Sequence, residues 1–259
     1  MRRRTAFTLI EILAVIAIIA ILAAILFPVI MRAKGSAQQS VAITQFSQLT
    51  KGLLMYSQEH DEKFVPSTNY GAPEGSPDRM WQTSVMPFVK EQRLFVAPES
   101  QGAFAATWAD RGVQSVGLSS ATAFSPSGCA DDLADSSGCQ AFKSAVAFSQ
   151  VQGLSQTAIL AVTANGPTDQ KYRGYEFSPY NGPINPVDIK LSPPMAGDID
   201  LVKANQDLDA DLLKPVFARY NATLNGDGTT PVAFADGSVK SYSANQINSD
   251  ASTIVWRFR

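Results

Sequence analysis

The distribution of hydrophobic and polar positions sets the N-terminal end of the 259-residue chain apart from the rest. All sixteen residues from Ile12 to Phe27 are apolar, and the run continues through one proline to Met31. Twenty helical residues, 12–31, would extend about 30 Å, which matches the hydrocarbon core of a membrane. The run therefore predicts one membrane-spanning helix.

The apolar pattern then changes to that of an amphipathic helix. Apolar residues recur at steps of three and four, which places them on one face of a helix. Polar residues such as Gln45 and Gln48 fall on the remaining surface. We expect one long helix whose first half lies in the membrane and whose second half packs on a globular domain. The apolar face of the second half comprises Ala42, Phe46, Leu49, Leu53 and Tyr56.

The remainder of the chain predicts an α+β domain. A short helix is expected over Met80–Lys90, and an antiparallel sheet is expected to pack on the amphipathic half of the long helix. The dipeptide Asp236-Gly237 predicts a two-residue type I′ hairpin turn. Segments 102–151 and 179–215 are interpreted as insertions that carry recognition. The expected strands are Leu94–Val96, Ala158–Val162, Tyr172–Phe177, Val232–Tyr242 and Ile254–Phe258.

Composition argues against most enzymes and against a globally basic nucleic-acid binder. The formal net charge is −2, and the chain has one histidine and two cysteines. A Ser-His-Asp triad or a four-cysteine zinc site would lack its usual residues. No nucleophile with a base and no pair of carboxylates has supporting context, so we expect no catalytic residues.

The N-terminal apolar run is preceded by Arg2, Arg3 and Arg4, as in a cleaved secretory signal peptide, but it is longer than such a signal requires. Glu11 is the residue that a signal peptide leaves unexplained. A carboxylate at the bilayer centre costs roughly 2.5 to 3.5 kcal/mol, and less near a helix end, so it normally has a partner. If the chain were cut between Ala6 and Phe7, the new amine of Phe7 could pair with Glu11 of the same or an adjacent subunit.

The segment Arg4-Thr5-Ala6-Phe7-Thr8-Leu9-Ile10-Glu11, followed by a long apolar helix, resembles the class III leader of type IV pilins and of type II secretion pseudopilins. The resemblance implies cleavage before Phe7 and N-methylation of its amine by a prepilin peptidase. It also implies that Glu11 orders subunits in a filament and that Pro28 bends the helix. Ala6 stands where the family usually has glycine.

A second resemblance rests on two parts of the chain: Leu53–Glu62, with Trp81 and Pro87–Lys90 downstream of it, and Val232–Lys240. Both stretches are similar to a pseudopilin-like family, abundant in planctomycete-type bacteria, with an Asp-Gly signature near the C-terminus. That family normally has a histidine ten positions before the Asp, and this chain has none there. The resemblance therefore implies only the fold and the class of protein.

The pilin resemblance implies a domain order and a set of partners. The leader would be 1–6, the membrane helix 7–31, its amphipathic continuation 32–63 and the extracytoplasmic domain 64–259. We expect a single-pass protein of the cytoplasmic (inner) membrane that is a structural subunit of a type IV pilus or secretion pseudopilus. Implied partners are prepilin peptidase, copies of itself or other pilins, an inner-membrane assembly platform with its ATPase, and membrane lipid. The alternative is a membrane-anchored surface binding protein that does not polymerise.

The cysteines, two clusters of oxygen ligands and the single histidine carry predictions of their own. Cys129 and Cys139 enclose nine residues, and a disulfide is the expected state for a domain outside the cytoplasm. Asn225, Asp227 and Thr229 offer oxygen ligands in a Gly-rich turn and are calcium candidates, as are Asp207, Asp209 and Asp211. A solvated turn is the favoured interpretation of both clusters, so we expect no resident cofactor or metal. His60 is expected at a solvated helix end.

Overall fold

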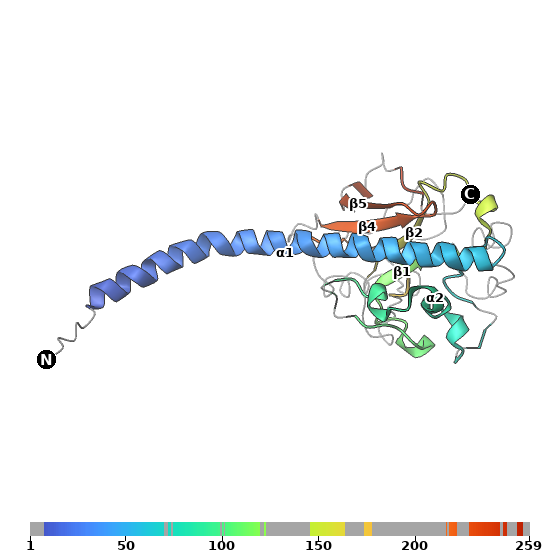
Figure 1. Ribbon diagram of the computed structural model, residues 1–259, viewed down its shortest axis with the longest axis horizontal. Coiled ribbons are helices and arrows are strands. Elements are labelled where there is room, and N and C mark those ends of the chain that lie inside the picture. Colours follow the sequence, from blue (N-terminus) through green and yellow to red (C-terminus); the bar gives the residue numbers. More distant parts are fainter. Residues whose placement is uncertain are drawn as a thin grey trace, which may run out of the picture. The chain divides into compact units, whose positions relative to one another are not determined.

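A computed structural model provides the three-dimensional structure, in which one long helix, α1, spans Leu9–Glu59 (Figure 1). By contacts the chain forms two units, Met1–Ala37 and Gln38–Arg259, and the second is called the body below. Helix α1 supplies residues to both. The structure describes residues 8–69, 72–73, 75–98, 100, 102–119, 122, 146–163, 174–177, 216, 218–221, 228–243, 246–247 and 253–255.

The second half of α1 is amphipathic, as the sequence predicts. Ala42, Phe46 and Leu49 are fully buried, Leu53 is nearly so, and Tyr56 is half-buried. This stripe belongs to the main hydrophobic core of the body, which also contains residues of the sheet. At Gly52 an added Cβ would collide with the side chain of Val89, so a glycine allows the second helix to approach closely.

Helix α1 ends at Glu59, four residues before the predicted boundary at residue 63. Asp61 and Glu62 both adopt positive φ, 54° and 56°, and the Glu62 N–H donates to the Ser57 carbonyl at 3.0 Å. This six-to-one hydrogen bond with an αL residue is the Schellman pattern of a helix C-terminus. Local backbone geometry therefore ends the helix within one turn of Tyr56, the last residue of the apolar stripe.

The segment after α1 contains one short helix, α2, at Trp81–Val89, and it confirms the expected helix over Met80–Lys90. The predicted strand at Leu94–Val96 is wrong, because a 3₁₀ helix occupies Gln92–Phe95. Its N-cap is Glu91, whose side chain accepts the Arg93 N–H at 3.2 Å. That capping contact favours a helical turn over an extended backbone for a short apolar run.

The sheet has five strands in the order β3-β1-β2-β4-β5. Three neighbouring pairs are antiparallel, and β1 pairs with β3 in parallel, so the predicted antiparallel sheet is in fact mixed. Strand β1 lies inside segment 102–151, so part of that predicted insertion belongs to the sheet. The strands are β1 Val116–Ser119, β2 Ala158–Val162, β3 Glu176–Phe177, β4 Thr229–Phe234 and β5 Val239–Ser243.

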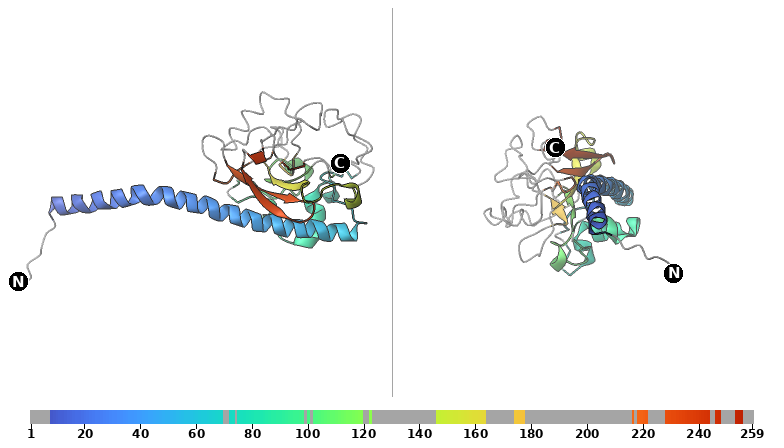
Figure 2. Two further views of the ribbon diagram at one scale, coloured as in Figure 1. Left: turned by 90° about the horizontal axis from the view of Figure 1, so that it is seen from above. Right: turned by 90° about the vertical axis from the view of Figure 1, so that its left-hand side faces the viewer.

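From Leu160 onward in β2, alternate residues enter two different cores, as the period of two requires; before it, at a register shift, Ile159 and Leu160 enter the same core. Leu160 and Val162 join the core that contains α1, whereas Ala161 between them joins a second cluster on the other face. Strand β4 alternates likewise, with Ala233 in the first cluster and Val232 in the second. Figures 1 and 2 both show β4 and β5 beside the second half of α1. The sheet is therefore covered on both faces.

The β4–β5 hairpin is confirmed, but its turn differs from the predicted type I′. Only Gly237 has a positive φ, 92°, among the described residues of the turn. The Gly237 N–H donates to the Phe234 carbonyl at 3.0 Å, and the Phe234 N–H donates to the Ser238 carbonyl at 2.9 Å. These bonds define a three-residue loop with a glycine bulge. Asp236 is instead held by Ser238, whose N–H and hydroxyl both donate to its carboxylate.

Two other predicted strands lie only partly within the described residues. Of the stretch Tyr172–Phe177, β3 covers Glu176–Phe177, and residues 172–173 lie outside the described residues. Within Ile254–Phe258, Val255 forms an isolated parallel bridge with Thr157, and residues 256–258 lie outside the described residues. The end of the described chain is thus attached to the start of β2 by a bridge and not by a full strand.

Candidate membrane and assembly site

The first half of α1 exposes large apolar side chains on every side. From Leu9 to Met31 the side chains of all large hydrophobic residues are 52–78% exposed, with the extremes at Met31 and Leu9. In the described part of the body, only Val41 and Met55 are large hydrophobic residues with comparable exposure. By length and composition, α1 is the one helix of the described residues that could cross a membrane.

Pro28 lies within this apolar stretch, and α1 continues through it. A proline inside a helix has no N–H for the carbonyl four residues earlier, here Ala24, and its ring crowds that carbonyl. Figure 1 shows the helix running past this region without a break. The sequence prediction that Pro28 bends the helix remains a prediction.

Glu11 is held at the N-terminus of α1 by Thr8, a partner that the sequence analysis missed. The Thr8 N–H and the Thr8 hydroxyl both donate to Glu11 Oε2, at 2.8 and 2.7 Å. The Glu11 N–H in turn donates to Thr8 Oγ1 at 3.3 Å. Thr8-Leu9-Ile10-Glu11 is therefore a reciprocal capping box, and the spacing Thr-x-x-Glu is the sequence signal for it. Ala6 and Phe7 lie outside the described residues.

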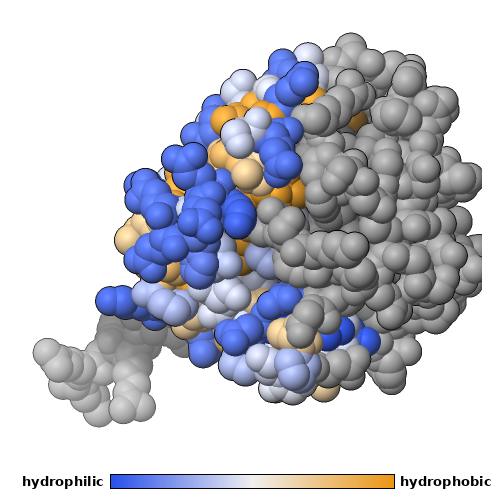
Figure 3. All heavy atoms as spheres, turned by 90° about the vertical axis from the view of Figure 1, so that its right-hand side faces the viewer, coloured by the Kyte–Doolittle hydropathy of each residue, from blue (hydrophilic) through white to orange (hydrophobic). Residues whose placement is uncertain are grey.

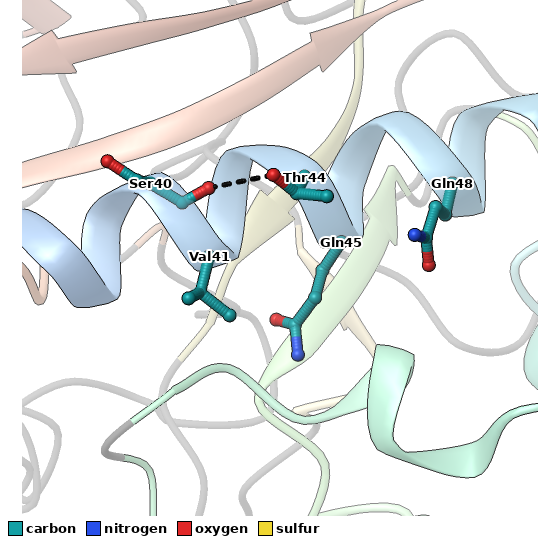
Figure 4. Close-up of a pocket in the computed structure, with 5 residues that line it drawn as sticks. All are labelled: Ser40, Val41, Thr44, Gln45 and Gln48. Atoms are coloured by element: carbon teal, nitrogen blue, oxygen red, sulfur yellow. Dashed lines mark hydrogen bonds between the residues drawn. The ribbon is translucent and has the colours of Figure 1, made fainter.

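The outward face of α1 within the body carries an open hollow of about 370 Å³. Figure 4 shows its lining residues on successive turns of the helix, with the Thr44 hydroxyl donating to the Ser40 carbonyl at 3.0 Å. Gln45 reaches the Arg93 carbonyl at 3.4 Å. The lining is uncharged and comprises Ser40, Val41, Thr44, Gln45 and Gln48. It contains no acid, base or metal-binding side chain.

A buried polar network joins strand β3 to the segment that follows α1. The Glu176 side chain, 2% exposed, accepts hydrogen bonds from the Ser67 hydroxyl at 3.1 Å and the Tyr175 hydroxyl at 2.7 Å. The Tyr175 hydroxyl also contacts Thr68 Oγ1 at 2.7 Å. Hydrogen-bonding donors of this kind are what a buried carboxylate requires, so the network is a structural feature.

A second polar cluster surrounds Trp108. The guanidinium groups of Arg79 and Arg111 each lie 4.6 Å from the centroid of its ring. Each guanidinium also donates to a main-chain carbonyl at 2.6 Å, Arg79 to Ala72 and Arg111 to Trp108. These contacts order the loops beside β3 by cation–π attraction and hydrogen bonding.

The other predicted site residues are only partly described. Thr229 begins β4, and its N–H and hydroxyl both donate to the Tyr220 carbonyl. Asn225, Asp227, the Asp207–Asp211 cluster, Cys129 and Cys139 lie outside the described residues. His60 is exposed and stacks on Tyr56, with ring centroids 4.0 Å apart. Within the described ranges, no three His, Cys, Asp or Glu side chains are grouped as a metal site.

Seen from the end at which α1 terminates, the described surface of the body is mainly hydrophilic, with separate small hydrophobic areas (Figure 3). The molecule is thus an α+β protein with a long N-terminal helix that is apolar enough to anchor it in a membrane. This helix begins with the capping box formed by Thr8 and Glu11.

A family model described as the prokaryotic N-terminal methylation motif matches residues 1–27. The chain therefore carries a prepilin-like leader, which points to a structural and non-enzymatic protein. Comparisons with curated proteins and with solved structures gave no match.

Proposed function

We propose that the protein is a structural subunit of a type IV pilus or a type II secretion pseudopilus. In this proposal a prepilin peptidase cuts the chain before Phe7 and methylates the new amine. The observation that supports it best is that the large apolar side chains of Leu9–Met31 are exposed on all sides of the helix, and that most of this stretch lies within the methylation motif at residues 1–27. The processed subunit is held in the membrane by this stretch and assembled through it.

The energetics of Leu9–Met31 require an apolar environment before and after assembly. Burying one large aliphatic side chain is worth roughly 1.5 to 3 kcal/mol relative to leaving it in water. More than a dozen such side chains are exposed here, so the stretch cannot remain in water. A bilayer provides the apolar environment before assembly, and the helices of neighbouring subunits provide it afterwards.

Moving an apolar helix from lipid to protein gains little hydrophobic free energy, because lipid tails are as apolar as leucine. Ordered assembly therefore needs a specific polar contact. We propose that the Glu11 carboxylate provides it by pairing with the Phe7 amine of a neighbouring subunit. Helix packing around Pro28 and the length of the apolar stretch would then set the spacing of subunits along the filament.

The flanking charges support an orientation with the body outside the cytoplasm. Arg2, Arg3 and Arg4 precede the apolar stretch, and Arg32 and Lys34 follow it. The excess of positive charge on the N-terminal side weakly favours a cytoplasmic N-terminus. That orientation places the leader at the cytoplasmic membrane face, where the peptidase acts. The assembly platform with its ATPase and other pilins or pseudopilins are the remaining proposed partners.

The first experiment is N-terminal mass spectrometry on the protein isolated from a cell that contains a prepilin peptidase. We expect a chain that begins with N-methylated Phe7. A chain that begins beyond residue 30, as a secretory peptidase would produce, contradicts the proposal. The same sample from a peptidase-deficient cell should retain Met1–Ala6 and serves as the control.

The second experiment replaces the carboxylate and measures filaments. Glu11→Leu should insert into the membrane and be cut, because both steps tolerate an apolar residue there, yet it should be absent from sheared filaments. The cost of leaving an amine without its partner in a low-dielectric bundle is about 3 to 5 kcal/mol for each contact. Equal filament yield for Glu11→Leu and wild type at matched membrane levels would contradict the role of Glu11.

A further inference from the structure

We draw no further inference here: the strongest candidate, the open hollow on the outward face of α1 within the body, lined by Ser40, Val41, Thr44, Gln45 and Gln48, carries nothing because nothing in the described residues shows what covers it.

Discussion

The two halves of α1 are built from the same kinds of apolar residues and have opposite surroundings. Between Leu9 and Met31 the large apolar side chains are more than half exposed on all sides of the helix. Between Ala42 and Leu53 the apolar side chains form one stripe that is buried in the body. A helix that is apolar all round needs an apolar environment on every side, whereas a striped helix needs one partner.

The polar contacts of the two halves differ in the same way. In the second half, Gln39 donates to the Ser241 hydroxyl at 2.5 Å and accepts from Asn221 at 3.0 Å, so its polar groups are satisfied by the body. In the first half, Glu11 Oε2 accepts two hydrogen bonds from Thr8, the residue directly before α1. The second half of α1 is therefore tied to the body by contacts with distant residues, whereas the hydrogen bonds of Glu11 are local.

The largest expected effect comes from truncating one apolar residue in each half. Phe46→Ala should lower the free energy of unfolding of the body by about 3 to 5 kcal/mol, because it opens a cavity in a fully packed core. Ile19→Ala, at a side chain 58% exposed, should change it by less than about 0.5 kcal/mol. Urea unfolding of the full chain in detergent micelles, followed by tryptophan fluorescence, makes the comparison. Similar losses for the two variants would mean that the halves are not energetically distinct.

The next effect concerns the hairpin turn that touches the second half of α1. Gly237→Ala should cost about 1 to 2 kcal/mol, because φ is 92° and an added Cβ would lie 3.2 Å from the Leu54 Cδ1 atom. Gly75→Ala is the matched control, since no atom lies within 4 Å of its added Cβ. Thermal unfolding of the two variants checks the difference. An unchanged Tm for Gly237→Ala would show that this turn does not support the helix.

The smallest expected effect is a loss of folding stability at high pH, and it arises from Tyr56 in the second half of α1. Burial, and then the negative charge of Asp78, raise the pKa of the Tyr56 hydroxyl above its ordinary value near 10. The folded state therefore holds this proton more tightly than the unfolded state does. The resulting stability is present in full below pH 10 and is lost as the pH rises through the folded pKa.

Spectrophotometric titration of the tyrosines tests this assignment. Asp78→Asn should move one ionisation back toward pH 10, and Tyr56→Phe should remove that ionisation. Tyr242, whose pKa is raised by burial alone, should not respond to Asp78→Asn. An unchanged titration curve for Asp78→Asn would remove Asp78 as a cause of the shift.

Sequence periodicity was sufficient for the helix and for the main hairpin, and for identifiable reasons. The stripe from Ala42 to Tyr56 repeats over four turns, and the Asp236-Gly237 dipeptide lies between two alternating runs. Features decided by single contacts were missed. The capping of Gln92–Phe95 by Glu91, for example, leaves no periodic signal.

Long-range pairing was also beyond the sequence pattern. The parallel pairing of β1 with β3 joins Leu118 to Glu176 across more than fifty residues, and alternation within each strand does not specify a partner or a direction. At the start of α1, the family resemblance identified Glu11, whereas its hydrogen-bond partner Thr8 depends on side-chain geometry. The spacing Thr-x-x-Glu is the sequence signal for this pairing.

The most direct test of the central claim is photo-crosslinking from one position in each half of α1. A photoreactive residue at Ile19 should crosslink to lipid in the membrane fraction and to another copy of the chain, or to a companion pilin, in sheared filaments. The same residue at exposed Lys51 is the control for labelling of the body surface. Crosslinks from Ile19 to lipid alone in every fraction would contradict the claim that this stretch exchanges the bilayer for neighbouring subunits.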